Sequence, residues 1–186
     1  MNELTVIRKH EKLQNIILYF FIYSFIGWCL ETIYAFLVLG HFVNRGFLIG
    51  PICPIYGFGA VLLILLLKNC KGKPVSEFII AAFAFTVFEY IVSYVLEAIF
   101  GLRWWDYSED FMNLQGRVSL AYTIIWGTLG ILLMEGIHPF ITKLLDKVKR
   151  HIKPKYQDII VVVFVVVLVV DVILSSIKYL SLEKLL

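Results

Sequence analysis

Long apolar stretches recur along this chain and constrain its fold more than any other feature. Of its 186 residues, 60% are hydrophobic and 17% are charged, so it carries more apolar surface than one soluble core can bury. About 20 apolar residues cross a hydrocarbon layer of roughly 30 Å. We therefore expect an all-α integral membrane bundle of about five transmembrane helices, over Ile16–Leu39, Phe47–Leu67, Phe78–Phe100, Val118–Ile137 and Ile159–Ile177.

The second apolar stretch begins irregularly. Glycine and proline gather in its first half, at Gly50, Pro51, Pro54, Gly57 and Gly59. These residues disfavour a regular helix, so we expect broken or re-entrant backbone that becomes helical at about Ala60. Irregular backbone at membrane depth needs protein or a wet cavity to satisfy its polar groups, and this half should therefore face inward.

Lysine and arginine set the expected orientation. Three regions are basic: before the first span (Arg8, Lys9, Lys12), after the second (Lys68, Lys71, Lys73) and after the fourth (Lys143, Lys147, Lys149, Arg150, Lys153, Lys155). The opposite loops hold Arg45, Arg103 and Arg117, and the tail holds Lys178 and Lys184. This distribution predicts a cytoplasmic N-terminus, and five spans then put the C-terminus outside.

A short set of residues occurs twice in the same order. The first copy is Glu31, Asn44-Arg45-Gly46 and Tyr56-Gly57, and the second is Glu97, Asn113-Leu114-Gln115-Gly116 and Trp126-Gly127. We interpret this as a duplicated two-helix unit, with repeats over about residues 16–67 and about 78–137. Two spans in each copy would relate the copies by rotation about an axis along the membrane normal. Chance similarity in an apolar background is the alternative.

Carboxylates within the spans are the first candidates for a functional role. They are Glu31, Glu89, Glu97, Glu135 and Asp171. A lone charge near the bilayer centre costs several kcal/mol, so these side chains should face the bundle interior or an interface. We expect Glu31, Glu97, Arg45 and Arg117 to form a ring near the outer mouth. The ring either consists of structural ion pairs or lines a polar pocket between the repeats. Asp171 is expected to hydrogen-bond a neighbouring helix.

The loop Gly101–Gly116 adds further candidates. Trp104 and Trp105 suit an aromatic belt at the membrane interface, and a lid that closes over an outer cavity is the alternative. The complete set of candidate binding residues is Glu31, Asn44, Arg45, Glu89, Glu97, Arg103, Trp105, Asp106, Asn113 and Arg117.

Several motifs together resemble a known family. They are Gly27-Trp28 with Glu31, Asn44-Arg45-Gly46-Phe47-Leu48 with Gly50-Pro51, Pro54-Ile55-Tyr56-Gly57, Trp105-Asp106-Tyr107, Asn113 with Gly116-Arg117, and Trp126-Gly127. This pattern resembles the ABC-transporter type IV family, the CmpB-like bacterial membrane proteins. The resemblance covers roughly Tyr19 to Glu135. It implies a multi-pass protein of the bacterial cell membrane that acts as a transporter permease.

An ABC permease needs an ATPase, and the sequence has no GxxxxGK[ST] phosphate loop. The ATPase subunit would therefore be a separate chain. Residues 139–157 form a basic amphipathic segment, in which Phe140, Ile141, Leu144, Leu145, Val148 and Ile152 share one side of a helix. Such a helix can lie flat on anionic lipid or dock an ATPase.

Other functional classes have weaker support in the sequence. Glu135 and His138 have the Glu-x-x-His spacing of carboxylate-bridged metal sites, but the further ligands that such sites need are missing. The three cysteines show no metal spacing, and no basic patch suits nucleic acid. We therefore expect no enzyme activity, no cofactor and no metal.

The sequence predicts a single transmembrane domain over residues 1–186. Its most consistent function is the membrane (permease) subunit of a small-molecule transporter, of ABC type with a separate ATPase subunit. A non-transporting membrane scaffold or sensor is the alternative. The expected partners are the lipid bilayer, the ATPase subunit and, in a homo-oligomer, further copies of the chain.

Overall fold

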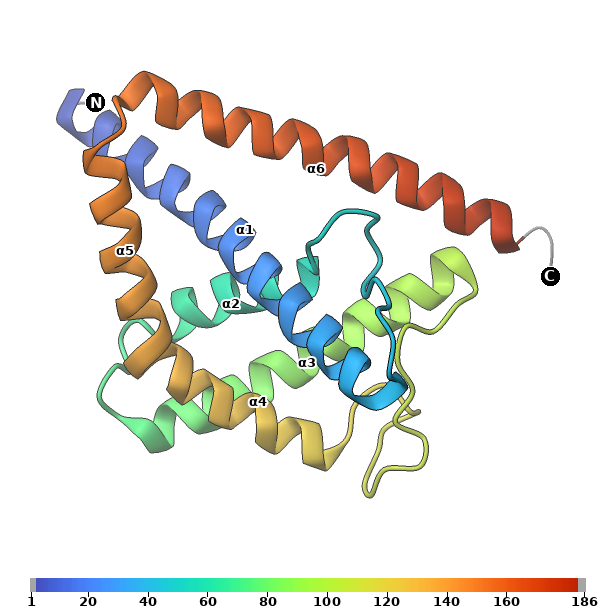
Figure 1. Ribbon diagram of the computed structural model, residues 1–186. Helices are drawn as coiled ribbons and strands as arrows, with labels where there is room; N and C mark the ends of the chain where they lie inside the picture. The colour runs from blue at the N-terminus through green and yellow to red at the C-terminus, as the bar shows by residue number, and fades with distance from the viewer. Residues whose placement is uncertain (1–2, 184–186) are drawn as a thin grey trace. The chain divides into compact units, whose positions relative to one another are not determined.

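The computed structural model of the protein describes residues 3–183, without the side chains of residues 3, 4, 6–8, 182 and 183. Its elements are α1 (Glu3–Leu39), α2 (Pro54–Leu67), α3 (Pro74–Phe100), α4 (Leu120–Leu132), the π-helix η1 (Leu133–Ile137), α5 (His138–Arg150) and α6 (Pro154–Glu183) (Figure 1). No strand occurs among the residues described, so the all-α prediction is confirmed. Lys184 and the side chain of Arg8 lie outside the described residues.

Four helical stretches are long and apolar enough to cross a membrane. They are Lys9–Leu39, Pro74–Phe100, Leu120–Arg150 and Pro154–Ser181. Helix α2 is apolar but has only 14 residues. At about 1.5 Å per residue it is about 21 Å long, which is short of a hydrocarbon layer of roughly 30 Å. The structure thus has four long apolar helices and one short one where we expected five full spans.

The irregular start of the second apolar stretch is shorter than expected. Residues 47–53 form no helix, but α2 begins at Pro54 and not near Ala60. Proline suits the first helical position, because its φ angle is already helical and the missing N–H would have no partner there. The segment faces inward only in part, since Leu48 is 2% exposed whereas Ile49 is 51% exposed.

The fourth expected span and the amphipathic segment form one continuous helical run. Helices α4 and α5 are joined through η1, where the run bends (Figure 1). A π-turn places an extra residue in one turn and often accompanies a bend. The amphipathic helix ends at Arg150, short of the expected limit at residue 157, because Pro154 cannot continue a helix and instead begins α6.

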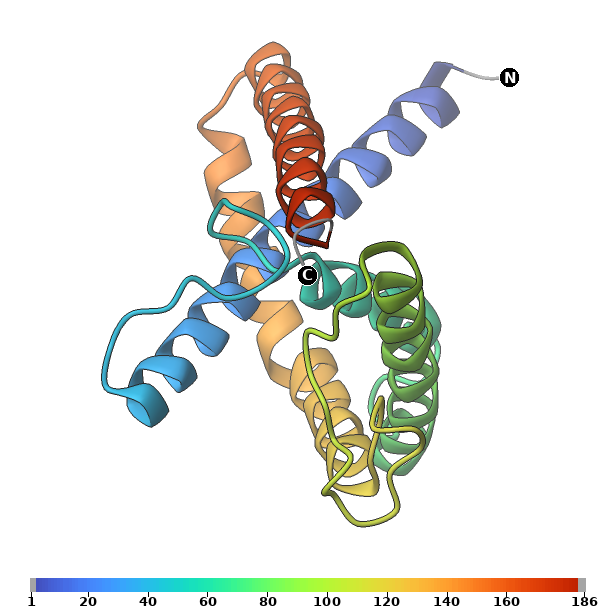
Figure 2. The same cartoon turned by 90° about the vertical axis from the view of Figure 1, so that its right-hand side faces the viewer.

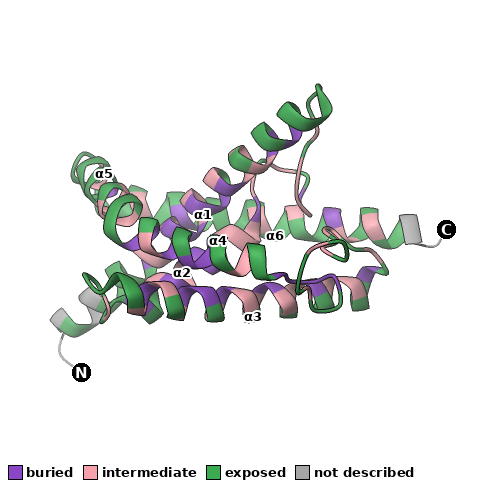
Figure 3. Ribbon diagram, turned by 90° about the horizontal axis from the view of Figure 1, so that it is seen from below, coloured by how far each residue is buried: buried purple, intermediate pink, exposed green. Residues whose placement is uncertain are grey.

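The chain forms two compact units, and the first comprises Met1–Val61 with Lys147–Lys178. Within it, α1 packs against α6 through the rings of Phe21 and Phe164, whose centroids lie 5.2 Å apart. Gln14 on α1 donates a hydrogen bond of 3.0 Å to Asp158 on α6. Most valines of α6 remain exposed (Figure 3), as expected for side chains that contact lipid.

The second unit comprises Leu62–Asp146 with Tyr179–Leu186. Its core is the antiparallel pair of α3 and α4, and the loop between them lies alongside both helices (Figure 2). The hydroxyls of Thr86 and Thr123 lie 2.9 Å apart across the pair. Gly130 lies directly against Ala81, where a Cβ on the glycine would collide with the alanine Cβ. Small residues thus let the two backbones approach closely.

One row of side chains on α3 faces α4. The buried residues Glu77, Ala81, Phe85, Glu89 and Ser93 follow each other at intervals of four. Residues four apart form a continuous ridge on a helix, and such ridges pack into the grooves of a partner. Glu97 continues the same row, so this ridge carries three carboxylates along a helix length of about 30 Å.

We predict that Gly130→Ala destabilises the protein. The new methyl group must displace Ala81, and such overpacking costs about 1–3 kcal/mol, more than the gain of at most about 1 kcal/mol from helix propensity. Thermal unfolding of the purified chain in detergent should show a lower Tm. Gly136→Ala is the matched control, because nothing lies within 4 Å of its new Cβ. A Tm of Gly130→Ala equal to that of the control would contradict this packing.

Candidate functional site

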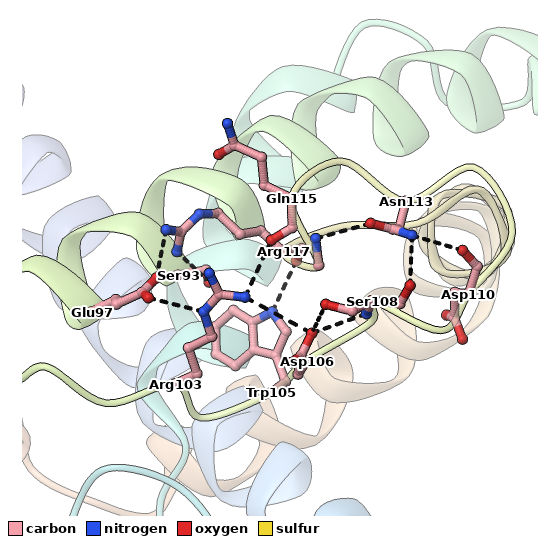
Figure 4. Close-up of polar contacts among 11 residues, drawn as sticks. Ser93, Glu97, Arg103, Trp105, Asp106, Ser108, Asp110, Asn113, Gln115 and Arg117 are labelled. Atoms are coloured by element: carbon pink, nitrogen blue, oxygen red, sulfur yellow. Dashed lines mark hydrogen bonds and ion pairs between the residues drawn. The ribbon is translucent and has the colours of Figure 1, made fainter.

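Glu97 holds two arginines at the C-terminal end of α3. Its Oε1 accepts a hydrogen bond of 2.9 Å from Nε of Arg103, and its Oε2 lies 2.5 Å from Nη2 of Arg117 (Figure 4). The second arginine is the more buried, with 9% of its side chain exposed. Arg103 also lies 3.9 Å from Asp106. Two acids and two bases therefore balance each other within this cluster.

Arg117 contacts several further groups, although its buried Nε has no hydrogen-bond partner among the described residues. Its Nη1 donates to the hydroxyl of Ser93 at 3.2 Å, and its guanidinium lies over the rings of Tyr90 and Tyr94, at 5.9 and 5.4 Å from their centroids. Its backbone carbonyl accepts a hydrogen bond of 3.0 Å from Nε1 of Trp105 (Figure 4). An arginine with this many protein partners is well suited to fasten the loop onto α3.

The loop itself is folded around Asp106 and Asn113. Asp106 accepts hydrogen bonds from the N–H and the hydroxyl of Ser108 (Figure 4). Asn113 donates to the carbonyls of Ser108 and Asp110 and accepts the N–H of Gly116. Gly116 has a φ of 67°, and a Cβ there would collide with Asp106 and Ser108, so glycine is required at this turn.

Glu89 lies at the middle of the buried ridge on α3 and is only 3% exposed. Nε1 of Trp126 donates to it at 2.9 Å, and the hydroxyl of Tyr107 donates at 3.1 Å. Both donors are neutral, and the ion pairs among the described residues include none with Glu89. Aromatic rings surround it, since Tyr107 stacks on Tyr122 and Phe85 on Trp126, each with centroids 4.1 Å apart. A buried carboxylate without a cation is the feature of this unit that a ligand could complete.

The first unit contains a second Glu–Arg pair. Nε of Arg45 lies 3.6 Å from Oε2 of Glu31, whose Oε1 accepts a hydrogen bond of 2.5 Å from the hydroxyl of Tyr56. Nε1 of Trp28 donates to Asn44 at 2.7 Å. The arginine side chain is 40% exposed and the glutamate 31%, so this pair is looser and less buried than the pair of Glu97 and Arg117.

Comparison with known proteins now adds the family. The chain matches, over residues 18–176, the model of the family described as "Putative ABC-transporter type IV". The chain belongs to this family. The motif resemblance is thus confirmed, and the match extends beyond the expected limit at Glu135 into the last helix. Together with the four long apolar helices, membership in this transporter family indicates a membrane protein. No curated protein and no solved structure matches the chain.

The predicted site residues fall into two groups. Glu31, Asn44 and Arg45 lie together in the first unit, and the other seven lie in the second. Six of the seven are connected through the loop and the cluster around Glu97, and Glu89 contacts the loop through Tyr107. Each of Glu31 and Glu97 has an arginine beside it. A single ring of both pairs, and a role of any of these residues in binding, stay predictions.

Asp171 contacts a loop and not the neighbouring helix that we expected. Its carboxylate accepts the N–H groups of Ile49 and Gly50 at 3.0 and 2.9 Å, and the hydroxyl of Ser175 at 3.0 Å. The sequence holds a signal for this contact, because Gly50 and Pro51 disfavour a helix and leave nearby backbone N–H groups without helical partners. Tyr107 and Trp126 donate to Glu89, and no comparable sequence signal predicts these two contacts.

Removing charges from the cluster around Glu97 tests its structural role. Glu97→Gln should lower the Tm, because it leaves the buried Arg117 without its carboxylate. Arg117→Gln should lower it as well, and the double variant should lose less than the two single variants together. Glu31→Gln is the comparison, and its more exposed pair should cost at most about 1 kcal/mol. Thermal unfolding of the wild type and these four variants decides, and strictly additive effects of Glu97→Gln and Arg117→Gln would argue against the pairing.

Acid should loosen the loop. Hydrogen bonds from the hydroxyl and N–H of Ser108, with the nearby Arg103, hold the pKa of Asp106 below its usual value. Since the folded pKa lies below the unfolded one, ionised Asp106 stabilises the loop above the unfolded pKa of about 3.9, and this contribution is lost as the pH falls through the folded pKa. Fluorescence of Trp105 should therefore change in acid. Asp106→Asn should remove that change, and an unaltered acid profile would contradict the assignment.

Proposed function

We propose that this protein is the membrane subunit of a transporter for small molecules that carry a positive charge, with ATP hydrolysis supplied by a separate chain. Family membership supports the transporter class. The observation that carries the proposal is Glu89, a buried carboxylate on an apolar helix whose hydrogen-bond donors are neutral. A charge at such a position is costly, and intramembrane carboxylates of this kind mark substrate or ion pathways.

The surroundings of Glu89 favour a cationic substrate. A positive group would supply the countercharge that the carboxylate lacks, and desolvated cations gain further from contact with aromatic faces. The rings of Tyr107, Tyr122 and Trp126 lie around the carboxylate. Tyr107 belongs to the loop, so a movement of the loop would change access to Glu89. In this proposal the loop acts as a lid, and the ion pairs of Glu97 hold the lid closed.

The sequence and the family support a separate ATPase chain. The chain has no phosphate loop, and ABC systems use a dedicated subunit for hydrolysis. Helix α5 offers a docking element, with Phe140 and Leu144 exposed on its apolar side and Lys143, Lys147 and Lys149 among its basic residues. The basic regions support an orientation with α5 and the N-terminus on the cytoplasmic face of the bacterial cell membrane. Contact of α5 with anionic lipid is the competing interpretation of the same face.

Similar contacts in the two units support a duplicated origin. Each has a glutamate on the first helix paired with an arginine from the following loop, next to a glycine with positive φ, Gly46 or Gly116. Ten residues after that glycine comes an aromatic donor to a carboxylate, which is Tyr56 to Glu31 in one unit and Trp126 to Glu89 in the other. The glycine that follows, Gly57 or Gly127, approaches the first helix closely. We propose two copies related by rotation about the membrane normal.

A non-transporting scaffold or sensor is the second candidate. Most charged side chains of the loop find partners within the chain itself, which a purely structural protein would also need. The two candidates differ in what they require of Glu89 and of an ATPase, and both requirements can be measured.

The test uses the whole chain purified from its native membranes. Tetraphenylphosphonium should raise the Tm of the wild type, and Glu89→Gln should lose this shift while still folding, because its amide oxygen can accept the N–H of Trp126 and its NH2 can donate to the hydroxyl of Tyr107. Triphenylphosphine oxide is the neutral probe, and Glu109→Gln, at an exposed position, is the control variant. ATPase activity should also copurify with the tagged chain in mild detergent. Equal shifts in Glu89→Gln and wild type, without copurifying ATPase, would favour the scaffold.

A further inference from the structure

A second group of carboxylates lies at the other end of α3, away from Glu89. Glu77 is in the first turn of α3, and Glu135 is in the π-turn η1. The N–H of Gly72 donates to both, at 3.1 Å to Oε1 of Glu77 and at 2.8 Å to Oε1 of Glu135. Two oxygens so close to one nitrogen are at most 5.9 Å apart, so the two carboxyl groups are close neighbours.

The two carboxyl groups differ in their exposure. Glu77 is completely buried, and its Oε2 receives no hydrogen bond from any donor among the described residues. Glu135 is exposed, and its Oε1 accepts the N–H of Gly72. Two adjacent carboxylates cannot both remain ionised at low cost, least of all when one of them is out of contact with water.

We propose that Glu77 and Glu135 together bind one proton, carried by Glu77 and donated to the carboxylate of Glu135. A proton gives the orphaned Oε2 of Glu77 a role as a hydrogen-bond donor and leaves one negative charge on the pair. Lys71 and Lys73 flank Gly72 in the sequence, Cys70 lies in the same turn, and His138 follows Glu135 by three residues, so these are neighbouring charged or titratable side chains along the chain. A metal ion fits less well, because the N–H of Gly72 already occupies an oxygen on each carboxylate.

The shared proton would join three parts of the second unit. The turn 68–72 is held through the N–H of Gly72, α3 through Glu77 and the π-turn through Glu135. Loss of the proton leaves two negative groups repelling each other across Gly72, which should release the turn. A carboxylate that only caps α3 would be ionised and would show no such dependence on pH. The proposal is independent of the transport of cations through Glu89.

Infrared spectroscopy of the purified chain tests the proton directly. At neutral pH the wild type should show a C=O stretching band of a protonated carboxyl group, and Glu77→Gln should lose it. Glu109→Gln, at an exposed position, should keep the band. An identical band in Glu77→Gln and wild type would overturn the proposal, as would a rise of Tm with Ca²⁺ or Na⁺ that only the wild type shows.

Cys70 provides a second readout within the turn. In a chain with Cys29→Ser and Cys53→Ser it is the single thiol, and it is half-buried. The rate of maleimide labelling should rise more steeply with pH in this chain than in the same chain with Glu77→Gln, whose amide imitates the protonated acid. Comparison at each pH cancels the titration of the thiol itself. A ratio of the two rates that stays constant across the pH range would overturn the proposal.

Discussion

A carboxylate on an apolar helix needs a partner, and most of the polar contacts in this protein follow from that requirement. Four acids meet it in four ways. Glu97 has two arginines, Asp171 has two backbone N–H groups, Glu89 has two neutral donors, and Glu77 has a second carboxyl group beside it. The first two arrangements are complete without a ligand. Glu89 has no cation in any ion pair of the described residues, and Oε2 of Glu77 has no hydrogen-bond donor among them, so a ligand or a proton could complete these two.

The completed arrangements do a structural task that the apolar residues cannot do. Lipid chains are as apolar as leucine, so burial of leucine gives little preference for one helix neighbour over another. Close approach at glycine and specific polar contacts provide that preference instead. Gly130 against Ala81 brings α3 and α4 together, and the hydrogen bond between Thr86 and Thr123 fixes one alignment of the pair. In the first unit, the hydrogen bonds from Ile49 and Gly50 to Asp171 fix the position of their loop on α6.

The sequence predicted the helices better than it predicted the contacts between them. Apolar length alone identified the helical segments, and the family motifs were recognisable without the structure. The sequence predicted too late a start for α2, because Gly57 and Gly59 disfavour a helix in general. A membrane helix nevertheless accepts glycine where a neighbour packs against it, as at Gly57. The proximity of Arg45 to Glu31 was predictable, because a carboxylate in an apolar span needs a countercharge and Arg45 lies in the loop that follows that span. The donors to Glu89 were not, because the contact between Tyr107 and Glu89 depends on the path of a whole loop.

The π-turn at residues 133–137 has a consequence for how this chain can vary. Each residue of an α-helix turns the chain by about 100°, so one extra residue rotates everything that follows by that angle. The turn thereby sets the facing of α5 independently of α4, which must keep Gly130 against α3. If the same residues formed a continuous α-helix instead, the lysines of α5 would face about 100° away from their present direction. The π-turn therefore changes the direction in which the following side chains point, so that one continuous helix can present different faces to its neighbours before and after the turn.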